Sequence, residues 1–120
     1  MMKPHEEFDA ALLYSIREEC ATILSRIAEK TLPDFVADPN LQDAVVMRLI
    51  LIGETVKRLS PHTKGEFPEI EWKDIARFRD KAVHHYSHVD FLQVWEIVRE
   101  NIPALLEGLA PERECSQPTT

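Results

Sequence analysis

Apolar residues recur along the chain at three- and four-residue steps, which is the pattern of amphipathic α-helices. The first stripe predicts a helix from about Glu6 to Lys30. Its apolar positions are Leu12, Ile16, Cys20, Ile23 and Ile27. The second helix, from about Asn40 to Leu59, is apolar on nearly every side and should be the most buried. No alternating strand pattern stands out, so the sequence indicates an all-α protein.

Two stretches that contain prolines interrupt this helical pattern, and we expect the first to be a break between helices and the second to be a loop. The first, TLPDFVADPN, covers residues 31–40, and Asp38 before Pro39 predicts a capped start for the second helix. The second, SPHTKGEFPEIEW, covers residues 60–72. Each stretch marks the boundary between two helices.

The C-terminal half predicts two further helices joined by a turn at SHVD. The third should run from about Glu71 to Tyr86 and the fourth from about Phe91 to Leu109. Pro103 should kink or interrupt the fourth helix, because proline lacks a backbone donor. Four helices with short connections predict an antiparallel four-helix bundle with a kinked last helix. We expect residues 1–110 to form this single domain and residues 111–120 to be a disordered polar tail.

Charge and composition narrow the class of protein. The chain has 120 residues and a formal net charge of −7, which argues against general attraction to nucleic acid or to an anionic membrane. The longest apolar run, LILI at residues 49–52, is too short to cross a bilayer, and the start lacks the apolar core of a secretion signal. The two cysteines, Cys20 and Cys115, fit neither a disulfide framework nor a zinc site. We therefore expect a cytoplasmic protein without membrane contact.

One short segment, RFRDKAVHHYSHVD at residues 77–90, gathers groups that move protons, bind phosphate or ligate metals. From Trp72 to Val89 four basic residues accompany two acidic ones, so this part is basic on an acidic chain. A solvated helix face is the plainest interpretation of such a cluster. A metal site is another, since His84 and His88 are four residues apart. With no cysteine nearby, we expect no metal and no cofactor.

The spacing within this segment also points to chemistry. Asp80 and His84 are four residues apart, so a carboxylate would lie beside an imidazole and raise its basicity, as for a general base. Arg79 precedes His84 by five residues, about 140° around an ideal helix. A site that uses both residues therefore makes most sense in a cleft between two copies of the chain. Arginine with histidine suits phosphate chemistry, as a fixed cation with a proton shuttle.

The second expected helix contains an unusual Gly53-Glu54 step. Glycine inside a helix costs about 1 kcal/mol relative to alanine, which indicates that another helix approaches its backbone closely. Glu54 is then either a partnered structural acid or a functional one, and the sequence leaves both open.

Together these elements resemble the HEPN superfamily, and more closely its HepT-like branch. The motif that carries the resemblance is Arg79-x4-His84-x-Tyr86, followed by a turn and a helix with Trp95. Three longer stretches are similar as well: DAVVMRLILIGETVKRLS to the family's second helix, FPEIEWKDIARFRDKAVHHY to its catalytic helix, and VDFLQVWEIVRENIPALLEGL to its last helix. Their order and spacing make the resemblance specific, and it covers most of the chain.

The resemblance implies a homodimeric, metal-independent endoribonuclease. Cleavage would use the ribose 2′-hydroxyl as nucleophile and leave a 2′,3′-cyclic phosphate. His84 would transfer protons, Arg79 would hold the charged phosphorane, and Asp80 would orient His84 or the RNA. Close relatives typically have asparagine at the position of Asp80, so this chain places an extra negative charge beside the substrate phosphate. Neighbouring side chains expected to contact RNA are Arg77, Lys81 and His85.

The resemblance also implies a partner protein. The family's toxins are paired with a minimal nucleotidyltransferase, an antitoxin that transfers AMP to the tyrosine of the motif, here Tyr86. Without the resemblance, Tyr86 would be interpreted as a packing residue at a helix end. Some members of the superfamily lack nuclease activity and serve as substrate-binding or scaffold partners of a nucleotidyltransferase. Because Arg79 and His84 are both present, we favour the ribonuclease.

Overall fold

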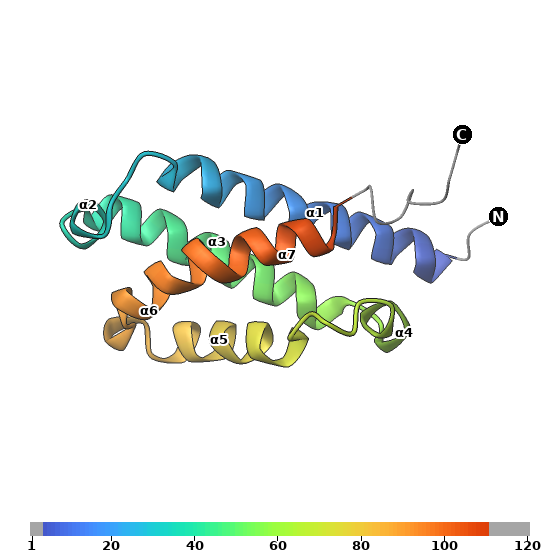
Figure 1. The fold of residues 1–120 in the computed structure, drawn as a ribbon. Helices are drawn as coiled ribbons and strands as arrows, with labels where there is room; N and C mark the ends of the chain where they lie inside the picture. The colour runs from blue at the N-terminus through green and yellow to red at the C-terminus, as the bar shows by residue number, and fades with distance from the viewer. Residues whose placement is uncertain (1–3, 111–120) are drawn as a thin grey trace, which may run out of the picture.

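The computed structural model describes residues 4–110, and every regular element in that range is helical. The α-helices are α1 (Pro4–Ile27), α2 (Leu32–Val36), α3 (Pro39–Arg58), α4 (Pro61–Gly65), α5 (Trp72–His84), α6 (Phe91–Glu96) and α7 (Ile102–Gly108), shown in Figure 1. A 3-10 turn, η1 (Tyr86–His88), and a π-helical segment, η2 (Ile97–Asn101), lie between them. The expected all-α class is confirmed. The expected polar tail, residues 111–120, lies outside the described residues.

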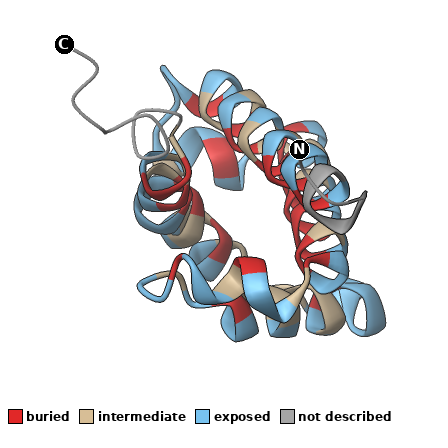
Figure 2. Ribbon diagram, turned by 90° about the vertical axis from the view of Figure 1, so that its right-hand side faces the viewer, coloured by how far each residue is buried: buried red, intermediate tan, exposed pale blue. Residues whose placement is uncertain are grey.

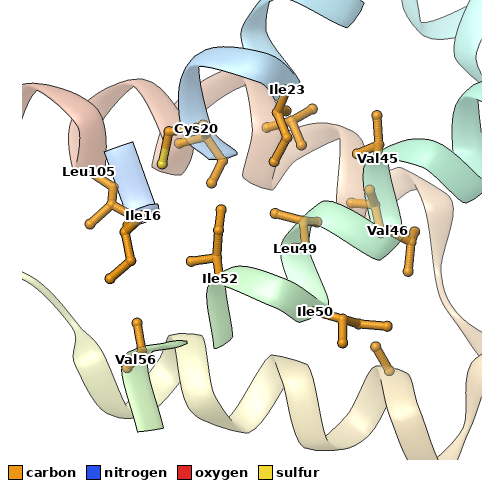
Figure 3. Packing of buried hydrophobic residues seen from close by; sticks show 14 of the residues in the cluster. Ile16, Cys20, Ile23, Val45, Val46, Leu49, Ile50, Ile52, Val56 and Leu105 are labelled. Atoms are coloured by element: carbon orange, nitrogen blue, oxygen red, sulfur yellow. The ribbon is translucent and has the colours of Figure 1, made fainter. Parts of the chain in front are cut away.

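Helix α3 is central and packs against α1 on one side and α5 on the other (Figure 1). The apolar stripe predicted on α1 is buried at each of its positions: Leu12, Ile16, Cys20, Ile23 and Ile27. Ile16 and Ile23 meet apolar side chains of α3, among them Leu49 and Ile52 (Figure 3). Buried positions follow the inward faces of the helices (Figure 2). None of the helices within residues 4–110 is long and apolar enough to span a membrane.

Two short helices lie between the long ones: α2 falls within the predicted break and α4 within the predicted loop, so the loop assignment was wrong for residues 61–65. Helix α2 begins after Thr31, whose side chain forms a capping box with Asp34. Helix α4 begins after Ser60, whose hydroxyl accepts the backbone N–H of Thr63. Both helices have proline in the first turn, where its missing donor costs nothing. The predicted Asp38 cap of α3 is confirmed.

The fourth expected helix runs from Phe91 to Gly108 but changes its hydrogen bonding midway. In η2, the backbone N–H of Ile102 donates to the carbonyl of Ile97, five residues back. This wide turn comes directly before Pro103, which has no N–H to offer an α-helical acceptor. The α-helical pattern is therefore interrupted where the proline predicted a disturbance. The kink itself and the antiparallel four-helix bundle stay predictions.

Candidate functional site

Helix α5 carries the first part, residues 77–84, of the segment singled out by the sequence, and its apolar residues hold it against the core. Trp72 at its start is buried, and its indole Nε1 donates to the carbonyl of Lys64 at 3.1 Å. Ala82, near the other end, is also buried. The helix ends at His84, two residues before the expected end, and Tyr86 begins the 3-10 turn. The polar residues of α5 are thereby presented along α3 and toward solvent.

Arg79 lies directly over Gly53 of α3. A β-carbon on Gly53 would collide with Cβ of Arg79 and stand 2.8 Å from its Cγ. It would also stand 3.3 Å from the carbonyl oxygen of Ile75. Only glycine therefore lets α5 approach α3 this closely, as the Gly53-Glu54 step predicted.

Four charged side chains form a continuous row across α3 and α5, which we call the charged row: Glu54, Arg79, Asp80 and Lys57. Nη2 of Arg79 donates to Oε1 of Glu54 at 3.3 Å, and Nη1 donates to Oδ1 of Asp80 at 3.0 Å. Nζ of Lys57 donates to the same oxygen of Asp80 at 2.7 Å. Glu54 and Lys57 are three residues apart on α3, so both reach the same part of α5. The charges alternate, and the charged row is neutral as a whole.

These contacts shift the pKa values of Arg79 and Asp80. The carboxylate of Asp80, followed by that of Glu54, raises the pKa of Arg79. The ammonium of Lys57, followed by the guanidinium of Arg79, lowers the pKa of Asp80. Both groups are charged at neutral pH, and Glu54 is a partnered acid of the charged row.

The guanidinium of Arg79 keeps hydrogen-bonding capacity despite these contacts. An arginine has five N–H donors, and Glu54 and Asp80 each engage one terminal nitrogen. Nε is buried and has no hydrogen-bond partner among the side chains described, those of residues 8–110, or the described backbone. One N–H on each terminal nitrogen is left for a ligand, and phosphate oxygens are acceptors that a guanidinium binds well. The side chain is 22% exposed, so a ligand reaches it from solvent.

The structure does not bring His84 to Arg79 or Asp80 within one chain. His84 is the last residue of α5 and is exposed. The carboxylate of Asp80 is directed at Lys57 and Arg79, and in the described part of the chain it makes no hydrogen bond or ion pair with His84. The carboxylate–imidazole pair expected from the four-residue spacing is therefore not formed.

The other two histidines of the segment are exposed as well. His88 lies in the 3-10 turn with Nδ1 3.0 Å from the hydroxyl of Ser87, and His85 lies just beyond the end of α5. Among the side chains that the structure describes, residues 8–110, no three from histidine, cysteine, aspartate or glutamate are grouped so that they could hold a metal ion.

Tyr86 is bound to α3 far from Arg79. Its hydroxyl donates to Oδ1 of Asp43 at 2.5 Å, and this bond, followed by burial, raises the pKa of Tyr86. Asp43 precedes Glu54 on α3, so Tyr86 and Arg79 contact that helix at points about 16 Å apart. The order of these contacts shows that α5 runs antiparallel to α3. Tyr86 is 44% exposed, so it is not a buried packing residue.

Arg77 and Lys81 point away from the charged row. Both line a cavity of about 620 Å³ between α5, α3 and the run from α6 to α7. Arg77 also pairs with Asp74, one turn earlier, at 3.0 Å. Around an ideal helix each of them is about 160° from Arg79. Within one chain, the expected RNA-binding residues Arg77 and Lys81 are thus directed away from Arg79, and the third, His85, lies at the C-terminal end of α5.

Sequence reasoning missed two residues of this region, Lys57 and Asp43. A local signal existed for Lys57, because it follows Glu54 by one turn on the helix face that Gly53 opens to α5. Asp43 gave no such signal. Its contact with Tyr86 depends on how far α5 extends along α3, which is a property of the tertiary structure.

Comparison with known proteins gives a family match and related sequences. A family model described as "Ribonuclease HepT-like" matches residues 16–110. The "Probable ribonuclease HepT" of Thermococcus cleftensis is 36% identical over 105 residues, which cover 88% of this chain and 92% of that protein. The "Putative RNase MJ0127" of Methanocaldococcus jannaschii is 37% identical over 93 residues, 78% of this chain and 77% of that protein. No solved structure matches the chain.

Proposed function

The chain belongs to the HepT-like ribonuclease family, and we propose that it is an endoribonuclease that cleaves RNA without a metal ion. The observation that carries this proposal is the state of Arg79, whose guanidinium is held by Glu54 and Asp80 and retains donors for a phosphate. His84, an exposed imidazole, ends the same helix. A fixed cation and an imidazole that can take up or release a proton are what phosphodiester cleavage requires.

In the proposed reaction, the ribose 2′-oxygen attacks the adjacent phosphorus, and the 5′-oxygen of the next nucleotide leaves. The products are a 2′,3′-cyclic phosphate and a 5′-hydroxyl. His84 removes the proton from the 2′-hydroxyl or supplies one to the leaving oxygen. Arg79 stabilises the charge that develops on the phosphorane oxygens through its remaining N–H groups. The net change transfers one proton from the 2′-oxygen to the 5′-oxygen.

A second copy of the chain completes the site in this proposal. Within one chain, the side chain of Arg79 is directed at α3. His84 lies about 140° away from Arg79 around the axis of α5. The surface between the charged row and Tyr86 is apolar and exposed at Met47, Leu51 and Val83. Exposed apolar side chains grouped in this way favour a contact between proteins. In a symmetric homodimer formed through this surface, His84 of one copy would approach Arg79 of the other.

The toxin role and its control are also part of the proposal, and they rest on the family resemblance. A minimal nucleotidyltransferase would act as antitoxin and transfer AMP to Tyr86, which is 44% exposed. The attached phosphodiester would bring a negative charge beside Asp43 and remove the proton that Tyr86 donates, so that hydrogen bond would break. The adenosine would then occupy the surface that faces the second copy and the RNA.

The test of this control uses Tyr86→Phe, with Tyr14→Phe as a matched variant of the other, 57% exposed tyrosine. After incubation with the nucleotidyltransferase and ATP, intact mass and residual RNA cleavage are measured together. Tyr86→Phe should stay unmodified and active, while Tyr14→Phe should gain AMP and lose activity like the wild type. Gain of AMP by Tyr86→Phe would place the switch at another residue.

The test of the ribonuclease itself is RNA cleavage in EDTA by the purified chain. Cleavage should persist, leave a cyclic phosphate, and stop when the 2′-hydroxyl at the cut site is replaced by hydrogen. Arg79→Ala and His84→Ala should each lower the rate by about 100-fold or more. Arg26→Ala and His62→Ala, at exposed positions on α1 and α4, are the matched controls and should cleave normally. Loss of cleavage in EDTA would contradict the metal-free reaction. Binding of the nucleotidyltransferase without any cleavage would favour the scaffold function.

A further inference from the structure

Lys57 contacts the carboxylate that lies directly beside the proposed phosphate-binding arginine. Its Nζ is 2.7 Å from Oδ1 of Asp80, and Nη1 of Arg79 is 3.0 Å from the same oxygen. Lys57 projects from α3, whereas Asp80 and Arg79 are neighbours on α5. The side chain of Lys57 is 43% exposed, so it is held by this ion pair rather than by burial.

Without Lys57, the surroundings of Arg79 would oppose an RNA phosphate. Arg79 supplies one positive charge, whereas Glu54 and Asp80, both hydrogen-bonded to it, supply two negative charges. An incoming phosphodiester is an anion, and like charges a few ångströms apart repel each other. The ammonium of Lys57 brings the charged row to neutrality and so removes this repulsion.

We propose that Lys57 is a positioning residue that acts through Asp80: it neutralises this carboxylate and keeps it against α3, so that Arg79 can bind an RNA phosphate. The inference rests on the proposed ribonuclease function and deepens it. Lys57 need not touch the RNA, because its ammonium is directed at Asp80. The lowered pKa of Asp80, of which the Lys57 hydrogen bond is the largest cause, agrees with this pairing.

A double-mutant cycle of Lys57→Met and Asp80→Asn tests this role. Methionine keeps a long unbranched side chain without charge, and asparagine keeps the acceptor oxygen of Asp80 without its charge. KM and kcat are measured for one RNA oligonucleotide in EDTA at low ionic strength. Lys57→Met should raise KM roughly fivefold while Asp80 is present, the upper end of what an exposed ion pair contributes. In the Asp80→Asn background the same change should alter KM by less than about twofold.

Three further measurements separate this role from a structural one. Lys57→Arg keeps the charge and should cleave like the wild type. Lys30→Met removes the same charge outside the charged row and should leave KM unchanged. The KM defect of Lys57→Met should shrink as salt is added, because ions screen exposed charges. A packing defect would instead persist in high salt and would lower Tm in both backgrounds.

Equal KM defects in both backgrounds would overturn the inference and would show that Lys57 contacts the RNA itself. An unchanged KM for Lys57→Met would overturn it as well. Failure of the proposed ribonuclease function can be told apart from failure of the Lys57 inference, because the wild type would then neither bind nor cleave the oligonucleotide. The Lys57 inference would then fail as well.

Discussion

Gly53 of α3 lies directly beneath Arg79 of α5, and the missing side chain at residue 53 sets the position of the arginine. The glycine costs helix α3 about 1 kcal/mol relative to alanine. In return the two helices come close enough for the guanidinium to reach Glu54 on α3 while it contacts Asp80 on its own helix. The arrangement proposed for catalysis therefore depends on a residue that contributes no functional group.

Gly53→Ala should destabilise the chain although alanine is the better helix former. The added β-carbon would collide with Cβ of Arg79, so α5 must move outward. Such overpacking costs about 1–3 kcal/mol, which exceeds the propensity gained. Thermal unfolding should give a lower Tm, and RNA cleavage measured below that Tm should also fall, because Arg79 is displaced.

Gly65→Ala is the matched control for this substitution. A β-carbon on Gly65 meets no atom within 4 Å, and no described glycine has a positive φ. This variant should unfold at the same or a higher temperature, because alanine restricts the unfolded chain. A Gly53→Ala protein as stable as the Gly65→Ala protein would contradict the close contact between α3 and α5.

The parts of the fold that depend on neighbours in the sequence could be predicted. Asp38 before Pro39 gave the start of α3, and the Gly53-Glu54 step gave the close approach of a second helix. The capping signals at Thr31 and Ser60 are equally local. The short helices α2 and α4 could therefore also have been predicted from the sequence.

The partners of the site residues could not be predicted, because they come from another helix. The spacing of Asp80 and His84 favoured a pair within α5, but α3 supplies Lys57, a permanent cation, at 2.7 Å. Asp80 pairs with this ammonium and with Arg79, and neither of these contacts involves His84. The Tyr86–Asp43 contact likewise requires knowledge of how α5 docks along α3.

Tyr86 should lose its proton at higher pH than an ordinary tyrosine, whose pKa is about 10. Asp43 accepts the hydrogen bond of the phenol and would repel a phenolate. The chain has two tyrosines, so Tyr14→Phe leaves Tyr86 as the only phenol for an ultraviolet titration. Adding Asp43→Ala to the Tyr14→Phe protein should lower the pKa of Tyr86 toward the ordinary value of a tyrosine. Identical titration curves with and without Asp43 would mean that the two side chains are not bonded in solution.

Asp80 should make the stability of the folded chain depend on pH in the acid range. Its pKa is lowered in the folded chain, so the ionised carboxylate stabilises the fold above its unfolded pKa of about 3.9. That stabilisation is lost as the pH falls through the lower folded pKa. The Tm difference between wild type and Asp80→Asn should therefore be largest at neutral pH. It should decrease as the pH falls below about 4. Calorimetry across this range is the measurement, and a difference that stays constant into acid would contradict the Lys57–Asp80–Arg79 contacts.

The proposal that two copies of the chain form one ribonuclease site is tested most directly by mixing two inactive variants. Arg79→Ala and His84→Ala are each purified, unfolded together in equal amounts and refolded so that mixed dimers form. A mixed dimer has one cleft with both residues intact and one with neither. Random pairing in a two-fold dimer then restores about a quarter of the wild-type sites. We expect RNA cleavage near that level from the mixture and essentially none from either variant alone. No cleavage, from a mixture that light scattering and mass spectrometry show to contain mixed dimers, would mean that Arg79 and His84 do not act across the interface.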